Sequence, residues 1–401
     1  MFNSLKFKVI LFGFIFTFFS SFGQSYFLGL FNSSIREALS ITHGQFGSIF
    51  ASATLCSSLL LIWVGKKIDD VNIFKFAFFV TILLSFACFF FSRITSVFLL
   101  FIGIFLMRFS GQGMMSHTAS TTISRYFTRT RGRALSISWF GLSSAEFVMP
   151  VLMVYLLTII DWQNLWIIFS ITVLIILPIT SFLLIKNLNL DSREANDENK
   201  KEVEIKQWKR REVIKDYRFY IISSNMLAMP WIFTGFAVFQ SFVQTSKGWG
   251  PYVIAQSFMS YSIFSVLTLF LSGFLIDKYS SRKLLIYMNI PLLLSVIVLF
   301  SFDTPVTAFV FLGLVGISNG FANILGSSTW AELYGVKYLG SIKALTTALM
   351  VFATAFGTAL FGYLIDTGFT VGDIAVVSGT YIFISLILLF FVRKKLNPVI
   401  I

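Results

Sequence analysis

Twelve apolar runs recur along the chain, and each is long enough to cross a lipid bilayer as a helix, which takes about 20 residues. Inside a bilayer the backbone must satisfy its own hydrogen bonds, so only helices and closed barrels can span it. These runs do not alternate apolar and polar residues as barrel strands do. We therefore expect an all-α membrane protein with twelve transmembrane helices. The expected helices are Val9–Phe31, Phe46–Val64, Ile73–Ser92, Ser96–Ser124, Ala134–Ile160, Leu165–Ile185, Phe219–Val243, Tyr252–Ile276, Leu284–Phe302, Val306–Trp330, Ala344–Ile365 and Ile374–Val392.

Basic residues predict the orientation, because Lys and Arg gather on the cytoplasmic side of membrane proteins. With the N-terminus inside, all but four of the 31 Lys and Arg residues fall in cytoplasmic segments; the exceptions are Arg36, Arg93, Lys247 and the intramembrane Arg108. Both termini are therefore expected in the cytoplasm. The net charge of +13 reflects this topology and contact with anionic lipid, so we expect no nucleic-acid partner. We expect the plasma (inner) membrane of a bacterium. The Phe-, Ile- and Lys-rich usage is typical of an AT-rich genome.

One stretch of the chain is dense in charge of both signs and poor in apolar residues, which indicates a solvated linker. It contains "DSREANDENKKEVEIKQWKRREVIKD", whose second half is compatible with a helix lying on the membrane surface. The linker separates six expected helices from six. We predict an N-terminal six-helix bundle over residues 1–185, a cytoplasmic linker over 186–218 and a C-terminal six-helix bundle over 219–401.

The two halves share a charge pattern at a constant spacing. "GKKIDDVNIFK" follows the second expected helix and "GFLIDKYSSRK" follows the eighth. Equivalent residues lie 208 positions apart, and they are Gly65 and Gly273, Asp69 and Asp277, Lys75 and Lys283, Tyr126 and Tyr334, and Gly132 and Gly340. Two parallel six-helix repeats are a known architecture of secondary transporters.

This pattern resembles the major facilitator superfamily, which carries Gly-x-x-x-Asp-basic-x-Gly-basic-basic between helices two and three and a weaker copy between helices eight and nine. Here the second copy is the stronger one, and it has Ser280 where Gly is usual. The first copy has Asp70 in place of the base and Asn72 in place of the Gly. The residues that match are Gly65 and Asp69 in the first copy, and Gly273, Asp277, Lys278, Arg282 and Lys283 in the second.

The motif predicts a cytoplasmic gate. Its Gly lets two helices approach closely, and its acid then sits near the N-terminus of a neighbouring helix, where the helix dipole favours negative charge. For Asp69 the expected neighbour is helix five, which begins near Arg131 and Arg133. For Asp277 it is helix eleven, which begins near Lys343. The alternative is that these are ordinary charged loops that only fix topology.

Two further stretches resemble the superfamily branch of monocarboxylate and oxalate–formate porters. They are "RFSGQGMMSHTASTTISRYFTRTRGRALSISWFGLSSAEFVMP", from Arg108 to Pro150, and "STWAELYGVKYLGSIKAL", which contains the turn beginning at Glu332. The branch holds its anion with a base in helix eight, and this chain has none there, which argues against a carboxylate solute. Gly141 is not followed by the Gly-Pro step of antiporters, which favours symport or uniport.

Two charged residues, Arg108 and Glu146, fall deep inside expected helices four and five. Such residues are costly in lipid and are usually functional. Their depths differ by about 6 Å at 1.5 Å per residue. Arg108 is open to three roles: binding a substrate carboxylate, conformational or proton coupling, or a structural ion pair with Glu146. Glu146 is the better candidate proton carrier. Gln112 shares the face of Arg108, whereas helical periodicity puts His117 on the opposite face.

Neutral polar residues inside the expected helices form a second candidate set. As a group we expect them to line a central cavity, with Pro230–Trp231 as a break in helix seven. The alternative for each is an interhelical hydrogen bond, which contributes about 0.6 kcal/mol. The set comprises Gln24 and Tyr26 in helix one, Asn225 and Gln240 in helix seven, Gln256 and Tyr261 in helix eight, and Asn319 and Asn323 in helix ten.

These features predict a secondary active transporter of a small organic solute, with monocarboxylates as one candidate class, working by alternating access with proton coupling. The chain has no Gly-x-x-x-x-Gly-Lys-Ser/Thr loop, so ion gradients rather than ATP should drive it. An efflux pump for apolar or drug-like compounds and a non-transporting sensor are the alternatives. An enzyme is not expected, because the two His residues and the scattered acids form no reactive cluster. We expect no metal or cofactor, and a monomer whose partners are the solute, protons and the bilayer.

Overall fold

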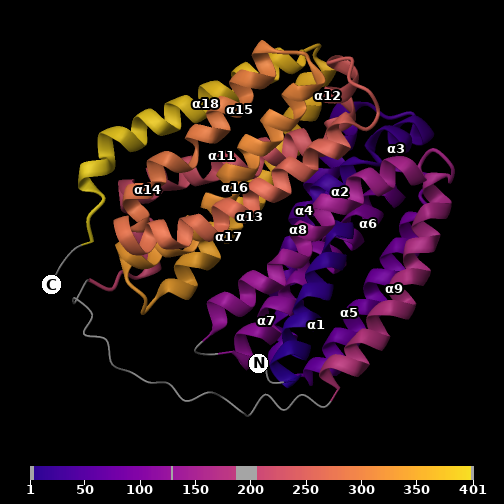
Figure 1. The fold of residues 1–401 in the computed structure, drawn as a ribbon, viewed down its shortest axis with the longest axis horizontal. Helices are drawn as coiled ribbons and strands as arrows, with labels where there is room; N and C mark the ends of the chain where they lie inside the picture. The colour runs from indigo at the N-terminus through magenta and orange to yellow at the C-terminus, as the bar shows by residue number, and fades with distance from the viewer. Residues whose placement is uncertain (1–3, 128–129, 187–205, 399–401) are drawn as a thin grey trace. The chain divides into compact units, whose positions relative to one another are not determined.

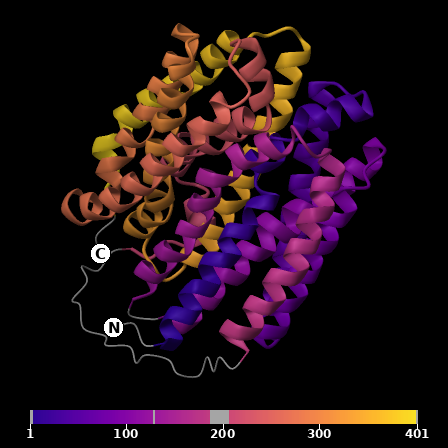
Figure 2. The same ribbon diagram turned by 45° about the vertical axis from the view of Figure 1, so that its right-hand side comes forward.

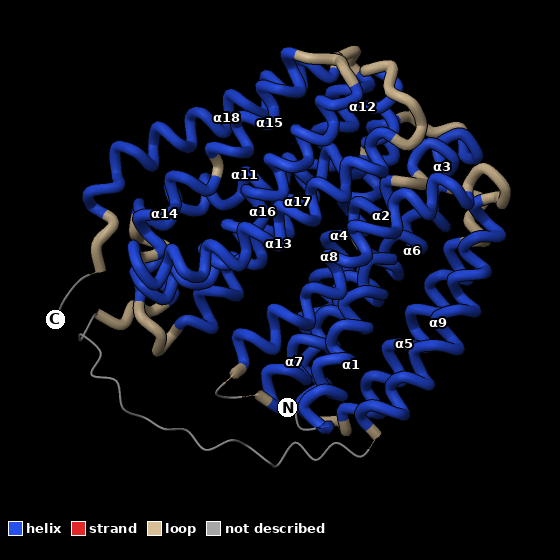
Figure 3. Tube along the Cα trace, viewed as in Figure 1, coloured by secondary structure: helices blue, strands red, loops and turns tan. Residues whose placement is uncertain are grey.

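A computed structural model describes residues 4–127, 130–186 and 206–398, without the side chains of Ser4, Asp69, Arg131, Asp277 and Ser327. All regular secondary structure in these residues is helical, and Figure 3 shows no strand. Twelve helices among them are long and apolar enough to cross a membrane. The expectation of an all-α protein with twelve transmembrane helices is confirmed.

The chain divides into two compact units, Met1–Asn199 and Lys200–Ile401, which we call the N-terminal and C-terminal bundles (Figure 1). The N-terminal bundle contains α1 (Ser4–Ser20), η1 (Ser21–Gly23), α2 (Ser25–Gly29), α3 (Asn32–Leu39), α4 (His43–Val64), η2 (Gly65–Asp69), α5 (Ile73–Phe91), α6 (Val97–Met107), η3 (Arg108–Met115), α7 (Ser116–Tyr126), α8 (Arg131–Leu156) and α9 (Trp162–Ile185).

The C-terminal bundle begins with the last part of the linker. Its elements are α10 (Arg210–Val213), α11 (Tyr217–Val238), α12 (Gln240–Ser246), α13 (Val253–Tyr279), α14 (Ser281–Met288), α15 (Ile290–Ser301), α16 (Pro305–Tyr334), α17 (Leu339–Asp366), α18 (Val371–Val392) and η4 (Arg393–Lys395).

The same helix pairs pack together in both bundles. In the N-terminal bundle α1 runs along α8, α5 along α9, and α4 along α6 and η3 (Figures 1 and 2). In the C-terminal bundle the corresponding pairs are α11 with α17, α15 with α18, and α13 with α16. Thus the first membrane span of each half packs on the fifth, the third on the sixth and the second on the fourth. The fold contains the two six-helix repeats that the sequence spacing predicted.

Local signals in the sequence set several helix starts. Thr42 and Gln45 form a capping box before α4, since the Thr42 hydroxyl accepts from the Gln45 amide and the Gln45 side chain accepts from the Thr42 amide. The side chain of Asn72 accepts from the Phe74 amide and caps α5. These caps satisfy donors that a helix start would otherwise leave unpaired. The third span therefore begins at Ile73, as predicted.

Three membrane spans are interrupted within the described residues, and hydropathy predicted none of these positions. The first span unwinds at η1 and Gln24, whose backbone is extended with ψ 151°. The fourth changes from α-helix to π-helix at η3. The seventh span continues without a break through Pro230 to its end at Val238, so the break expected at Pro230–Trp231 is wrong. The ninth breaks at Asn289.

Candidate functional site

Arg108 is the first residue of the π-helix η3 and is 3% exposed. Its Nη1 donates to the Gly23 carbonyl oxygen and to the Ser25 hydroxyl, each at 3.1 Å. The guanidinium also lies 5.3 Å from the centre of the Phe50 ring, within the range of a cation–π contact. The cation is therefore held by the first, second and fourth spans of one bundle.

The break in the first span makes the contact with Gly23 possible. An unwound residue leaves backbone groups outside the helical ladder, and such groups at membrane depth are tolerated where protein partners satisfy them. A Cβ atom on Gly23 would overlap the Met107 carbonyl and the Gln112 amide, and one on Gly111 would lie 2.7 Å from the Gly23 nitrogen. The broken first span and the π-helix thus cross in backbone contact, which only glycine allows at this distance.

The π-helix changes which residues of the fourth span share a face. Its turns are wider than those of an α-helix, and π-turns are frequent at functional sites. His117 Nε2 lies 3.0 Å from the Gly65 carbonyl oxygen at the end of the second span, and Arg108 lies over Phe50 of the same span. Both residues therefore face α4 and η2, so the expectation that His117 lies opposite Arg108 is wrong. It assumed an unbroken α-helical period across η3.

Glu146 lies in α8 and is 8% exposed. The residues that the structure describes provide it with no hydrogen bond or ion pair, and Arg108 bonds to Gly23 and Ser25 instead. The structural ion pair between Arg108 and Glu146 is therefore not formed here. Glu146 does lie within electrostatic reach of Tyr26, which is 2% exposed and follows the break in the first span. The N-terminal bundle thus buries both candidate side chains, Arg108 at the break in the first span and Glu146 in the fifth span.

The remaining polar candidates have diverse surroundings. Gln24 and Gln112 are half-buried beside the site just described. In the C-terminal bundle, Asn225 is 0% exposed, and its carbonyl accepts from the Asn289 side chain at 2.6 Å, across the break in the ninth span. Asn319 is half-buried and donates to the Ser265 hydroxyl at 2.9 Å.

Four further candidates also lie in the C-terminal bundle. Gln240 is buried and donates to the Ala237 carbonyl at 2.9 Å. Tyr261 is buried and stacks on Phe233, with ring centres 4.8 Å apart. Gln256 and Asn323 are exposed. The role of the whole set in a cavity stays a prediction. Asn225 contacts the ninth span through its backbone carbonyl, which accepts from Asn289 at the break in that span.

Of the candidate gate residues in the C-terminal bundle, Glu332 and Arg282 contact each other. Its Oε2 accepts from the Ser281 amide at 2.9 Å and from the Ser281 hydroxyl, and its Oε1 pairs with Arg282 Nε at 2.9 Å. Glu332 of α16 therefore caps α14 from a neighbouring helix. Ser280, which precedes this cap, has φ 73° and ψ 150°, a conformation adopted almost only by Gly.

The first copy of the motif, in the N-terminal bundle, makes different contacts from the second copy. Asn72 caps its own helix, His117 bonds to the Gly65 carbonyl, and Arg125 Nη1 donates to the Ile68 carbonyl at 3.1 Å. The side chains of Asp69, Asp277 and Arg131 lie outside the described part of the structure. Arg133, Lys278, Lys283 and Lys343 are exposed. A Cβ on Gly273 would meet none of the described atoms within 4 Å, so these residues make no close helix approach at this Gly.

No group of three or more His, Cys, Asp or Glu in the described part of the chain is arranged to hold a metal ion. The chemistry that this region offers is therefore that of one buried guanidinium, one buried carboxyl group and neutral hydrogen-bonding groups.

Comparisons with known protein families and solved structures agree with the fold described above. The chain matches the family model described as Major Facilitator Superfamily over residues 13–258 and 220–400. It is similar to the structure of a bacterial homolog of the human lysosomal transporter Spinster, inward-facing and unoccupied, with a TM-score of 0.74 and 12% identity over 98% of both chains. It is also similar to the nucleoside transporter NupG, with a TM-score of 0.70 and 15% identity over 98% of this chain and 99% of that one. No curated protein sequence matches it.

Proposed function

We propose a function from one premise, which is that this chain belongs to the major facilitator superfamily. It is accordingly a multi-pass membrane transporter and not an enzyme. We infer that it moves a small organic solute by alternating access between its two bundles, that one anionic group of the solute binds Arg108, and that protonation of Glu146 couples the movement to a proton gradient.

The observation that carries this proposal is that Arg108 and Glu146 are buried in one bundle without being paired to each other. Burying a charge without a counter-charge is costly, so such residues persist mainly where they serve a function. Arg108 uses one nitrogen for its two hydrogen bonds, and its buried Nε has no partner. A guanidinium with unused donors suits a carboxylate. Glu146, lacking a fixed cation, is free to gain and lose a proton during the cycle.

A monocarboxylate is the first solute class to test. One Arg neutralises one carboxylate, and the resemblance of the fourth and fifth spans to monocarboxylate and oxalate–formate porters agrees with that charge. The base with which that branch holds its anion in the eighth span is missing here, which argues against this class unless Arg108 holds the carboxylate alone. Neutral solutes, including the nucleosides named for one structural neighbour, belong in the same panel because the half-buried Gln24 and Gln112 beside Arg108 could orient them.

The efflux alternative requires a large apolar site. In the C-terminal bundle the aromatic-lined cavity among Phe233, Phe236, Trp249 and Phe311 has room for about one water molecule. That cavity is too small for a drug-like compound, so it does not favour efflux.

The location and topology belong to the same proposal. We place the chain in the plasma membrane of a bacterium with both termini in the cytoplasm, because the Lys and Arg distribution follows the positive-inside rule. We also expect a monomer. Labelling of Lys66→Cys and Lys247→Cys in intact cells tests the orientation, with Cys56→Ser and Cys88→Ser in both variants. Residue 247 should react with an impermeant thiol reagent and residue 66 should not, and the reverse pattern would refute the assignment.

The decisive experiment is flux in vesicles that contain the purified protein. Accumulation of a labelled monocarboxylate should rise with an inward proton gradient and collapse when a protonophore dissipates it. Glu146→Gln should retain exchange of solute across the vesicle membrane but lose the response to the gradient. Glu37→Gln, which alters an exposed acid of the same bundle, serves as the matched control for loss of a carboxylate. Flux that ignores the gradient, or Glu146→Gln with normal coupling, would reject proton coupling through this residue.

A further inference from the structure

The described end of the linker, residues 206–216, packs against the C-terminal bundle, and we call this segment the strap. The Trp208 amide donates to the Tyr334 carbonyl at 3.0 Å, and the two rings lie 5.4 Å apart. The Gln207 side chain accepts from the Lys337 amide at 2.9 Å. Val213 is fully buried in a core cluster that includes Phe219. The strap is therefore docked on the turn between α16 and α17.

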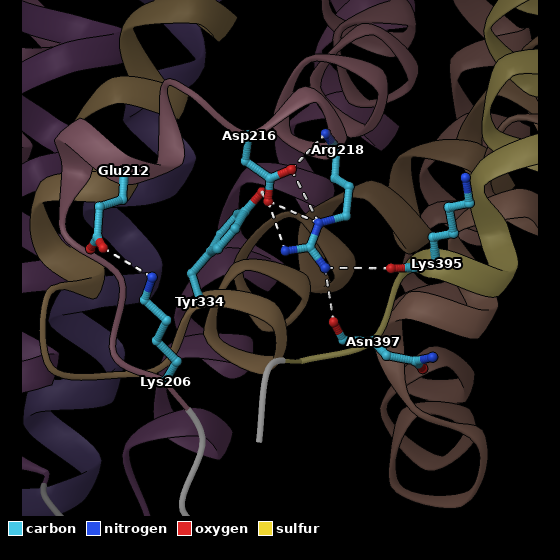
Figure 4. A network of polar contacts seen from close by, with 7 residues as sticks. All are labelled: Lys206, Glu212, Asp216, Arg218, Tyr334, Lys395 and Asn397. Atoms are coloured by element: carbon cyan, nitrogen blue, oxygen red, sulfur yellow. Dashed lines mark hydrogen bonds and ion pairs between the residues drawn. The ribbon is translucent and has the colours of Figure 1, made fainter. Parts of the chain in front are cut away.

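The acids of the strap are already partnered (Figure 4). Glu212 pairs with Lys206 at 3.0 Å and accepts from the Lys209 amide at 2.8 Å. These hydrogen bonds hold the pKa of Glu212 below its usual range, so the carboxylate remains ionised at neutral pH. Asp216 pairs with Arg218 at 2.8 Å and accepts from the Tyr334 hydroxyl at 3.1 Å. No acid of the strap is left to neutralise its other bases.

Those other bases lie on an outward face. Because Val213 points into the core, Arg210, Arg211 and Lys215 are exposed, and none of the three has an acid partner among the residues described. Apolar and aromatic side chains lie beside them. Ile214 is 40% exposed, Tyr217 is 52% exposed and Tyr220 is 55% exposed, and the Tyr220 hydroxyl donates to the Ile214 carbonyl at 2.8 Å.

This face has the composition of a membrane interface, and it immediately precedes a membrane span. The span begins at Tyr217, so the bases stand just outside the apolar layer. Basic residues next to a span attract anionic headgroups, and tyrosines are enriched at the same level. A short amphipathic segment of this kind lies in the plane of the interface.

We propose that the strap face binds the headgroups of anionic phospholipids on the side of the membrane that the linker occupies. The face consists of Arg210, Arg211, Ile214, Lys215, Tyr217 and Tyr220. The three bases contact the phosphates, and Ile214 and the tyrosines lie at the level of the glycerol backbone. Because Trp208 and Gln207 link the strap to Tyr334 and Lys337, bound lipid also holds the turn between α16 and α17.

The test uses the full-length protein in detergent, titrated with phosphatidylglycerol or with phosphatidylcholine, with amide hydrogen exchange followed over the peptide that contains the strap. Phosphatidylglycerol should slow exchange in this peptide, and phosphatidylcholine should not. The variant Arg210→Gln, Arg211→Gln, Lys215→Gln should need on the order of a hundredfold more phosphatidylglycerol for the same effect, because each base near an anionic surface contributes roughly fivefold.

Two controls keep the test decisive. Arg210→Lys, Arg211→Lys, Lys215→Arg keeps the charge and should respond as the unaltered protein does, even if the glutamine variant folds poorly. Lys66→Gln, Lys67→Gln, Lys75→Gln removes three exposed bases from the N-terminal bundle and should leave the strap response intact. Equal protection by both lipids, an unchanged response in the glutamine variant, or displacement by inorganic phosphate would overturn the proposal.

Discussion

The fourth and tenth spans are equivalent by the 208-residue repeat, yet they are built differently. In the N-terminal bundle the fourth span contains a π-helix, carries the buried Arg108 and crosses a broken first span. In the C-terminal bundle α16 runs as an uninterrupted α-helix of 30 residues. The position equivalent to Arg108 is Gly316, where a Cβ would overlap the Tyr261 carbonyl of α13. One half therefore uses this span to hold a charge, and the other uses it for close helix packing.

The polar contacts follow the same division. Asn319 and Ser318 of α16 bond to Ser265 and to the Met288 carbonyl, so they tie the tenth span to its neighbours with neutral groups. Arg108 instead bonds to groups that the break in the first span exposes. Equivalent spans after a duplication thus need not keep equivalent chemistry, and the buried guanidinium to which we assign a function belongs to the N-terminal bundle.

The prediction with the largest expected effect compares the charged fourth span with the neutral tenth span. Arg108→Gln should lower solute flux into vesicles about a hundredfold, because a charge-assisted hydrogen bond to a solute anion contributes roughly 1.5–3 kcal/mol. Asn319→Ala should cost only about 0.6 kcal/mol of stability and reduce flux by less than threefold. Comparable losses for both variants in the same flux assay would show that transport depends equally on the buried charge of one half and the neutral contacts of the other.

The second prediction concerns the crossing of Gly23 with the π-helix. Gly23→Ala forces a methyl group into backbone atoms of Met107 and Gln112, and overpacking of this kind costs about 1–3 kcal/mol. Gly273→Ala enters open space and should be tolerated, although Gly273 belongs to the superfamily motif. Thermal denaturation of the purified variants measures both. A stable Gly23→Ala, or an unstable Gly273→Ala, would contradict the packing described.

Much of this fold follows from sequence because lipid leaves the backbone few options. Apolar run length sets the number of spans, and the cap at Asn72 sets the start of the third span where it was predicted. Hydropathy averages over about twenty residues, so it misses local changes of backbone geometry. The signals were nevertheless present: "SSFGQS" at the break in the first span, "GQG" in the π-helix and "NIP" at the break in the ninth.

The candidate site was less predictable for a related reason. Arg108 and Glu146 could be identified as buried charges from their place in apolar runs alone. Their partners depend on rotation about the helix axes, which depth does not give. The π-helix alters that rotation beyond Arg108, so the prediction for His117 failed. Ser25 and Phe50 were missed because a hydroxyl and a Phe in a span are common and become informative only once Arg108 is seen beside them.

The third prediction compares the caps of the third and ninth spans. Glu332→Gln removes the carboxylate that accepts from Ser281 and pairs with Arg282, and should cost about 1–2 kcal/mol. Asn72→Ala removes a cap within one chain segment and should cost about 1 kcal/mol. Hydrogen exchange at the starts of α14 and α5 localises each loss. If Glu332→Gln leaves exchange at Ser281 and Arg282 unchanged, the capping role assigned to Glu332 is wrong.

The smallest expected effect is also the sharpest, because one substitution at two equivalent positions should act with opposite signs. Asn72 and Ser280 both stand where the superfamily motif has Gly. Ser280 has φ 73° and a buried hydroxyl without a partner, so Ser280→Gly relieves strain and should raise stability by about 1 kcal/mol. Asn72 has φ −54° and caps α5, so Asn72→Gly should lower stability by a few tenths of a kcal/mol. The midpoint of thermal denaturation should therefore rise for Ser280→Gly and fall for Asn72→Gly. A shift of the same sign in both would mean that the two copies of the motif share one turn geometry.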